Sequence, residues 1–209
     1  MAKLWDISQT LRAGLPVWPG DTDFACDEVW TIGPDCPVKV SRLTLSTHSG
    51  AHADAPSHYE PEGEDMAAAD IGLYIGPCRL ITAQRRGSHV HPGDLDWEKI
   101  GASERVLIRT YSKFPHETWD SDFRALHADT IHALAAAGCR LVGVDSASLD
   151  PETSKTMDAH HAVHRHGLRI LEGLVFDGVP DGRYELIALP LKLTTADAAP
   201  VRAILRALD

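Results

Sequence analysis

Long apolar runs, internal repeats and a secretory leader are all missing from this sequence of 209 residues. No apolar run approaches the ~20 residues that a membrane-spanning helix needs. The first residues, MAKLWDISQT, lack the basic-then-apolar layout of a signal peptide. Because no repeat or low-complexity stretch interrupts the chain, we expect one domain over residues 1–209.

Cysteine is scarce, and its spacing excludes two kinds of stabilising framework. The four cysteines are Cys26, Cys36, Cys78 and Cys139, and no two of them form a Cys-x-x-Cys pair. This spacing argues against a zinc ribbon and against a disulfide framework. We expect reduced thiols in a cytoplasmic protein.

Basic residues are also in the minority. The chain has 30 Asp and Glu against 20 Lys and Arg, a formal net charge of -10. Such a surface repels phosphate backbones and anionic lipids, so nucleic acid and membrane surfaces are not expected as partners. The hydrophobic share of 44% is ordinary for a globular protein that buries a core.

Short apolar or β-branched runs recur along the chain, each bounded by Gly, Pro, Asp or Ser. Runs of this kind predict strands, here over 4–7, 38–45, 78–82, 105–108, 140–144, 169–176 and 184–189. One clear helix is predicted where Asp129 can cap it, Ile131 and Leu134 share a face, and Gly138 ends it. Strands outnumber helices, so we expect an α/β fold with a mixed, antiparallel-rich sheet rather than a regular βαβ winding.

Histidine is the abundant exception, with twelve residues that cluster in two places. One group is His48, His52 and His58, and the other is His160, His161, His164 and His166. Imidazole at this density indicates metal binding or proton transfer near neutral pH. The pairs His89 with His91 and His127 with His132 are expected to be surface or capping histidines.

The first group lies in the segment HSGAHADAPSH, which also contains Asp54. Residues four apart are ~13 Å apart in an ideal strand, but their Cβ atoms are only ~6 Å apart in a helical turn. We therefore expect the preceding strand to end near Ser46 and the chain to coil around an ion, bending at Gly50. His48, His52 and Asp54 match a catalytic Zn²⁺ or similar ion with one position open for water. His58 is then free to act as an acid or base; the alternative is a turn whose imidazoles bind backbone carbonyls.

The second group precedes an apolar run that Glu172 interrupts. A carboxylate inside a buried strand is costly unless it is paired or bound to a metal. Ligation of a metal and a salt bridge to an arginine are equal alternatives for Glu172. His164 and His166 are expected at a solvated helix end, and the residues alone do not select a ligand among His160, His161 and His164.

An early loop, LPVWPGD, holds Trp18 between two prolines. A tryptophan with so little freedom can form a rigid wall for a flat ligand. It can equally be pinned against the core to close a turn.

At this point the sequence resembles a known family. HSGAHADAPSH is similar to the His-x-Gly-Thr-His-x-Asp-x-Pro-x-His signature of the cyclase family of metal-dependent hydrolases. The segments at 6–8, 15–21, 143–145 and 169–172 resemble that family in the same order, so the resemblance spans nearly the whole chain. Ala51 departs from the usual Thr, which removes any hydrogen bond from that side chain but no ligand.

The resemblance implies a swivelling β/β/α-type domain, a homodimer and a site with two Zn²⁺ ions. By position, His48, His52 and Asp54 would hold one zinc. Asp54 would bridge to a second zinc held by His160 and Glu172. His58 would donate and accept the proton, and Trp18 would contact an aromatic substrate. Mn²⁺ and Fe²⁺ accept the same ligands.

The resemblance further implies a metal-dependent amide hydrolase, and we expect the substrate to be the aromatic formamide N-formyl-L-kynurenine of tryptophan breakdown, with L-kynurenine and formate as products. The alternatives are another amide, such as the cyclic amide of isatin, and a metal-binding protein or histidine-rich scaffold without turnover. No Gly-x-Ser-x-Gly elbow is present, which argues against a serine-hydrolase route.

Overall fold

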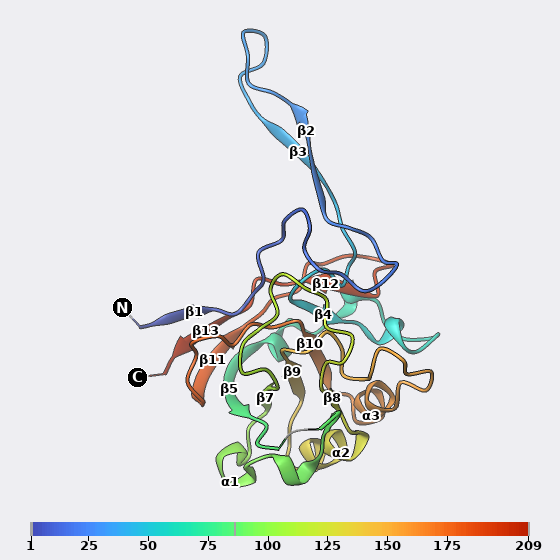
Figure 1. Ribbon diagram of the computed structural model, residues 1–209, viewed down its shortest axis with the longest axis vertical. Coiled ribbons are helices and arrows are strands. Elements are labelled where there is room, and N and C mark those ends of the chain that lie inside the picture. The colour runs from blue at the N-terminus through green and yellow to red at the C-terminus, as the bar shows by residue number, and fades with distance from the viewer. Residues whose placement is uncertain (1, 86, 209) are drawn as a thin grey trace.

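Short strands build one large curled sheet in the computed structural model, which describes residues 2–85 and 87–208 (Figure 1). The order of the nine strands is β1-β13-β11-β5-β7-β9-β10-β4-β12. In chain order they are β1 (Leu4–Asp6), β4 (His52–Asp54), β5 (Ile75–Thr82), β7 (Arg105–Arg109), β9 (Leu141–Val144), β10 (Arg169–Glu172), β11 (Gly182–Ile187), β12 (Ala198–Pro200) and β13 (Ile204–Ala207).

Five of the eight pairings in this sheet are antiparallel and three are parallel. The predicted α/β class with a mixed, antiparallel-rich sheet is confirmed. The centre differs from the expectation, because β5, β7, β9 and β10 run parallel and the chain crosses between them as βαβ units. The antiparallel strands flank this centre on both sides.

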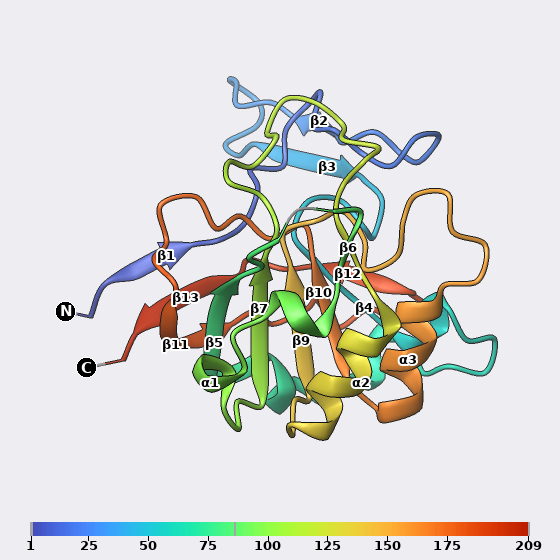
Figure 2. The ribbon, with the colours of Figure 1, turned by 60° about the horizontal axis from the view of Figure 1, so that its bottom comes forward.

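Helices cover one face of the parallel centre, where Figure 2 shows them in front of the strands. They are α1 (Trp97–Ile100), α2 (Ala128–Ala136) and α3 (Asp158–His166). The 3₁₀ turns Pro56–His58, Met66–Ala68, Ile71–Tyr74 and Pro92–Asp94 precede α1 in the chain. The predicted helix is α2, but His127 caps it, not Asp129: the ring Nδ1 of His127 accepts from the Asp129 amide at 3.2 Å. From the sequence only the solvated end of α3 is predicted, because few of its residues are apolar.

The strands separate two hydrophobic cores by the alternation of their side chains. In β7, Leu107 packs into one core, while Val106 and Ile108 face the other. The second core is closed by α2 and α3, through residues such as Ile131 and Val163. Period-2 alternation thus fixes which face of each strand meets the helices.

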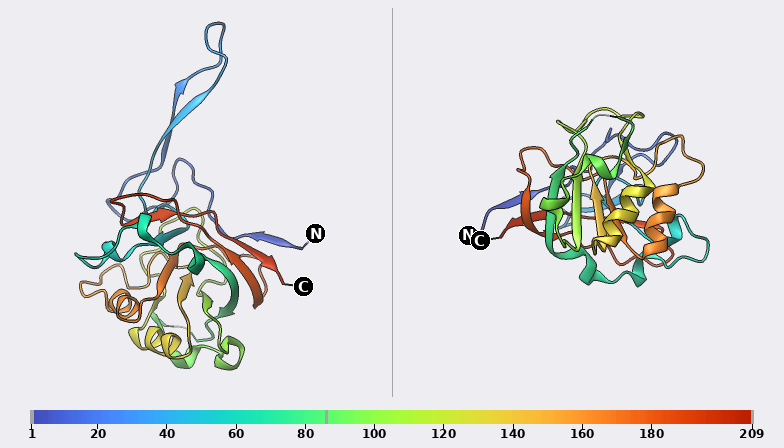
Figure 3. Two further views of the ribbon diagram at one scale, coloured as in Figure 1. Left: turned by 180° about the vertical axis from the view of Figure 1, so that it is seen from behind. Right: turned by 90° about the horizontal axis from the view of Figure 1, so that it is seen from below.

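A two-stranded hairpin stands away from this body, as Figures 1 and 3 show from opposite sides. It pairs β2 (Ala25–Trp30) with β3 (Val40–Thr44) in antiparallel register. A second small sheet joins β6 (His89–Val90) to β8 (Ala125–Leu126). All four cysteines are free thiols, as predicted. Among residues 2–85 and 87–208, no helix combines the length and the apolar character that crossing a membrane requires.

Candidate metal and catalytic site

The HSGAHADAPSH segment is a tight turn followed by a strand. β3 ends at Thr44, close to the predicted end near Ser46, and Gly50 turns the chain with a φ of +65°. The expectation that 48–54 coils as a whole is wrong, because His52–Asp54 forms the buried strand β4. The turn nevertheless brings the His48 ring to 4.9 Å from the His52 ring. The bend at Gly50 thus brings His48 and His52 close together even though His52 belongs to a strand.

Strand pairing brings the second half of the site to the first. β4 lies between β10 and β12, and Glu172 is directly opposite His52 in the antiparallel register. Residues opposite each other on neighbouring strands point to the same face, and so do residues two apart on one strand. His52, Asp54 and Glu172 therefore share the face that α3 covers.

The backbone packs closely here because of a glycine. A Cβ on Gly173 would lie 2.4 Å from the Gly50 carbonyl oxygen, and its φ is +62°. Only glycine accepts both conditions without strain. The residue after Glu172 thus lets β10 approach the His48–His52 turn.

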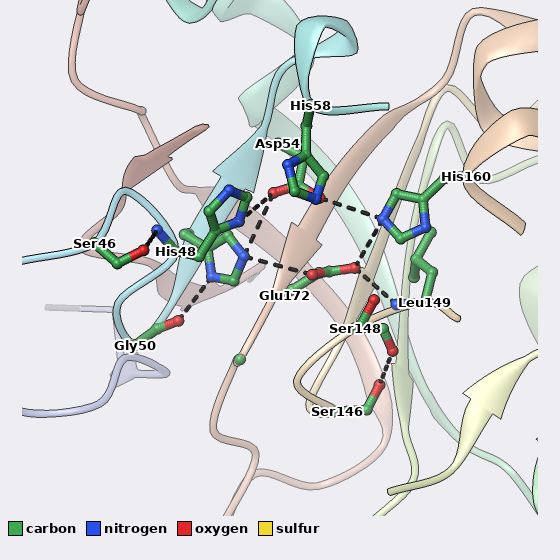
Figure 4. Close-up of polar contacts among 12 residues, drawn as sticks. Ser46, His48, Gly50, Asp54, His58, Ser146, Ser148, Leu149, His160 and Glu172 are labelled. Carbon is green, nitrogen blue, oxygen red and sulfur yellow. Dashed lines mark hydrogen bonds and ion pairs between the residues drawn. The ribbon is translucent and has the colours of Figure 1, made fainter. Parts of the chain in front are cut away.

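The Asp54 carboxylate is the centre of the cluster (Figure 4). Its Oδ1 is 3.3 Å from His48 Nδ1 and 3.4 Å from His52 Nε2. Its Oδ2 is 3.5 Å from Nε2 of His160 on α3. Glu172 spans the other side, with Oε2 at 3.4 Å from His52 Nε2 and Oε1 at 3.6 Å from His160 Nε2. All five predicted ligands therefore converge.

These atoms have the burial and spacing that divalent cations require. Both Asp54 oxygens, His52 Nε2 and His160 Nε2 are buried, and no hydrogen-bond partner for them occurs among the described residues. Unpartnered buried polar atoms are costly, and here they face one another. Ligands bound tetrahedrally to zinc at 2.0–2.2 Å lie about 3.4 Å from each other, which is the spacing observed around Asp54. The residues present therefore fit metal binding.

Contacts outside the cluster orient two of its histidines. The Nδ1 of His52 lies 2.9 Å from the Gly50 carbonyl, and the Nδ1 of His160 lies 2.7 Å from Asp150 Oδ2. Each contact places the proton on Nδ1 and leaves the unprotonated Nε2 facing the carboxylates of the cluster. The Leu149 amide donates to Glu172 Oε1 at 2.7 Å. Among the described residues Glu172 faces His52 and His160 and forms no ion pair with an arginine, which favours the alternative of metal ligation over an arginine salt bridge.

The structure also separates His160 from its neighbours on α3. The ring of His161 pairs with Glu60 at 2.9 Å, away from the cluster, and His164 and His166 are exposed. His160 is fully buried and faces both carboxylates. Of the histidines among which the residues alone left the choice open, His160 is thus the one that the structure places against Asp54 and Glu172.

The carboxylates of the cluster stabilise positive charge on the groups around them. Burial lowers the pKa of His48, but Asp54 and Asp197 outweigh it and raise that pKa to about 9. Burial also opposes protonation of His160, yet Asp150 and Asp54 raise its pKa to about 10. For Asp54, burial raises the pKa, and the neighbouring histidines more than reverse this and hold it well below its usual range. The cluster therefore attracts positive charge, which a divalent cation can supply in place of protons.

A cavity of about 480 Å³ opens onto the cluster. His48, His52, His58 and Glu172 line one part of it. Trp18 lines another part, with its ring 5.4 Å from Trp119 in an edge-to-face contact. The loop of Trp18 thus forms an aromatic wall beside the cluster.

Comparison with known proteins agrees with this geometry. The model of the family named Cyclase, described as "Putative cyclase", matches residues 5–151. A protein of Maricaulis maris (strain MCS10) named kynurenine formamidase is 75% identical over 208 residues, which is 100% of both chains. The chain belongs to the cyclase family. The family resemblance of the sequence is confirmed.

Solved structures extend the agreement to the fold of the cyclase family. A potential metal-dependent hydrolase with cyclase activity superposes with a TM-score of 0.85 at 27% identity, over 100% of both chains. Isatin hydrolase A from Labrenzia aggregata superposes with a TM-score of 0.82 at 20% identity, over 100% of this chain and 94% of that one. The first of these structural neighbours is thus named as a metal-dependent hydrolase. In this cyclase-family chain, the unpartnered polar atoms around Asp54 likewise indicate a metal cofactor.

The cyclase-family site contains one carboxylate that the sequence analysis missed. Asp197 Oδ2 lies 2.9 Å from His48 Nε2 and 3.2 Å from His58 Nδ1, and Thr47 donates to Oδ1 at 2.9 Å. Burial raises the pKa of Asp197, but the bonds from His48 and Thr47 lower it to about 2. Its segment, TTADAA, contains no motif. Asp197 is recognised only in the fold, where the pairing of β12 with β4 places the residue before β12 beside His48 and His58.

His58 lies between the cluster and the solvent. Its ring centroid is 4.3 Å from that of His48 and 6.0 Å from that of His160, and its side chain is 30% exposed. One ligand atom each from Asp54, His58 and His160 also fall within 4.8 Å of one another. The geometry therefore allows His58 either to exchange protons or to ligate, and mutation distinguishes the two.

Proposed function

We propose that this chain hydrolyses N-formyl-L-kynurenine to L-kynurenine and formate as a metal-dependent arylformamidase. The observation that carries the proposal is the unpartnered Asp54 carboxylate between His52 and His160, beside an aromatic-walled cavity. The full-length relative at 75% identity, named kynurenine formamidase, supports this substrate. Site residues come from Trp18 to Asp197, so the proposal assigns residues 1–209 to one hydrolase domain. The four free thiols support a cytoplasmic location.

The proposed metal ligands divide into two sets that share Asp54. His48, His52 and Asp54 would hold one Zn²⁺, and Asp54, His160 and Glu172 a second, with Mn²⁺ or Fe²⁺ acceptable to the same atoms. A divalent cation bound there supplies a Lewis acid for the formyl oxygen and lowers the pKa of water toward neutrality. The Nε2 of His52 lies near Oδ1 of Asp54 and the Nε2 of His160 near Oδ2, and this division between the two oxygens supports two ions rather than one.

His58 is the proposed acid and base. Its Nδ1 lies 3.2 Å from Asp197, which keeps the proton on Nδ1 and leaves Nε2 free to accept one. A proton leaves the attacking water as the new C–O bond forms, and His58 Nε2 takes it. The same proton then passes to the anilide nitrogen as the C–N bond breaks, because an anilide anion is a poor leaving group. The products are formate and the free arylamine.

Trp18 is the proposed contact for the aromatic ring of the substrate. It lines the cavity and packs on Trp119 and Phe123, with ring centroids at 5.4 and 6.2 Å. Rings fixed in this way offer a flat apolar surface at small entropic cost. A planar formanilide placed against it presents its formyl group toward His58 and the Asp54 cluster.

The rival substrate is isatin, whose hydrolase shares the fold at 20% identity. Initial rates of the zinc-loaded chain on N-formyl-L-kynurenine and on isatin distinguish a formamidase from an isatin hydrolase. We expect kcat/KM on the formamide to be at least about 100-fold higher than on isatin, since differences in several pocket contacts with the two substrates act together. Chelated protein is the control. Equal or faster turnover of isatin would contradict the formamidase proposal.

We also propose that the chain forms a homodimer in which a second copy covers the hairpin β2–β3. Several large apolar side chains there are exposed, among them Trp30 at 55%, Ile32 at 67% and Leu43 at 57%. An isolated hairpin is marginally stable in water, and monomers rarely expose such a patch. Sedimentation equilibrium should give twice the mass of one chain, and Ile32→Glu should lower it. Wild-type protein that sediments as a single chain would contradict the homodimer.

A further inference from the structure

The cavity beside the Asp54 cluster has a distinctive charge pattern at its walls. Apart from the cluster itself, its charged lining residues are Asp21 and Glu152, both carboxylates. Within residues 2–85 and 87–208, neither lysine nor arginine lines it. The walls therefore favour a positively charged group on the substrate and offer no cation to a negatively charged one.

Glu152 is the carboxylate with capacity to bind a ligand. Its Oε2 accepts from the indole N–H of Trp119 at 2.6 Å, which fixes the carboxylate at the aromatic wall. In the part of the chain that the structure describes, no lysine, arginine or histidine forms an ion pair with it. Asp21 differs, because two groups engage it: the Thr22 amide donates to its Oδ1 at 2.6 Å, and although burial raises its pKa, hydrogen bonds from Ser46 and Thr22 lower that pKa.

The surroundings of Glu152 match the recognition of an ammonium group. Trp119 stands edge-to-face with Trp18, so two indole rings border the same part of the cavity. A carboxylate at the N–H edge of one indole and near a second offers charge pairing to an ammonium group, to which the face of a ring adds cation–π attraction, and partial burial strengthens both. Glu152 is half-buried, which limits screening by solvent.

We propose that Glu152 and Trp119 form a subsite for a primary ammonium group on the side chain of the substrate. The inference rests on the proposed function and adds to it the basis of selectivity among aryl formamides. N-formyl-L-kynurenine carries its α-ammonium at the end of the chain that leads away from the formanilide. The subsite binds that ammonium, while the α-carboxylate, which meets no cation on the walls, points to the open mouth of the cavity.

Four substrates test the subsite. They are N-formyl-L-kynurenine, its decarboxylated amine, its deaminated acid, and N-(2-acetylphenyl)formamide, which carries neither charge. Each is assayed with zinc-loaded wild type, with Glu152→Gln, and with Glu98→Gln. Glu152→Gln keeps an acceptor for the Trp119 N–H. Glu98 is an exposed carboxylate on α1, so Glu98→Gln makes the same charge change outside the cavity.

We expect wild type to use the two ammonium-bearing substrates with kcat/KM at least about tenfold above the deaminated acid, as a partly buried charge pair predicts. Glu152→Gln should remove most of that preference through KM, with kcat on each substrate little changed, and Glu98→Gln should retain it. A wild type without the preference, or an equal loss on all four substrates in Glu152→Gln, would overturn the subsite. If wild type hydrolyses none of the four, the proposed function itself fails, whereas turnover without an ammonium preference refutes only the subsite.

Discussion

Asp54→Asn should lose tightly bound metal and lower kcat/KM by about 10³-fold or more. The two oxygens of Asp54 face His48, His52 and His160, so one substitution weakens both proposed metal positions. The asparagine side chain has one oxygen ligand and no negative charge, so a bound divalent cation would lose its central anionic ligand. Metal content by atomic emission and initial rates measure the two effects together.

A second buried aspartate provides the matched control for Asp54. Asp94 is 4% exposed, pairs with Arg124 at 2.7 Å and is not among the residues that line the cavity. Asp94→Asn should lower the free energy of unfolding by about 3 kcal/mol, because it leaves a buried guanidinium unpaired, yet keep the metal. If Asp54→Asn retains full metal content and rate, Asp54 is not the bridging ligand.

His58→Gln should keep the metal and lower kcat by about 10²- to 10⁴-fold, the usual range for a general acid–base group. The reason is geometric: His58 touches Asp197 through Nδ1 and leaves Nε2 toward the cavity, where glutamine cannot relay a proton. KM should change little, since the aromatic wall is intact. Steady-state rates and metal content, measured on the same preparation of the variant, test this prediction.

The contrasting result for His58 is informative because the structure permits it. If His58→Gln loses metal together with activity, His58 is a ligand with Asp54 and His160, whose atoms lie within reach. His164→Gln is the control, since His164 is an exposed histidine on α3 and should leave both metal and rate unchanged.

Local patterns predicted the parts of the fold that depend on local contacts. The apolar runs at β7 and β9 and the helix α2 bury their side chains within a short stretch of chain, so their periodicity is visible in the sequence. β4 was missed because its residues His52, Ala53 and Asp54 have no strand signature. It becomes a strand only because β10 and β12 pair with it on both sides.

The site divides in the same way. The spacing of the histidines and Asp54 between His48 and His58 is visible in the sequence and indicates a metal site. Glu172 lies opposite His52 only because of the pairing register of β10 with β4, which cannot be predicted from one sequence. Asp197 and Glu152 are ordinary acidic residues of loops, and they gain meaning only from the side chains that the fold places beside them, His58 and Trp119. Their contacts span long stretches of chain, for which the sequence offers no periodicity.

The most direct test is a titration of the metal-free chain with Zn²⁺, followed by the initial rate of N-formyl-L-kynurenine hydrolysis. Two overlapping ligand sets around Asp54 predict no turnover in the chelated protein and a maximal rate near two equivalents of zinc per chain. A full rate at one equivalent would contradict the second metal position. A rate that chelation leaves unchanged would contradict metal-dependent hydrolysis at this site.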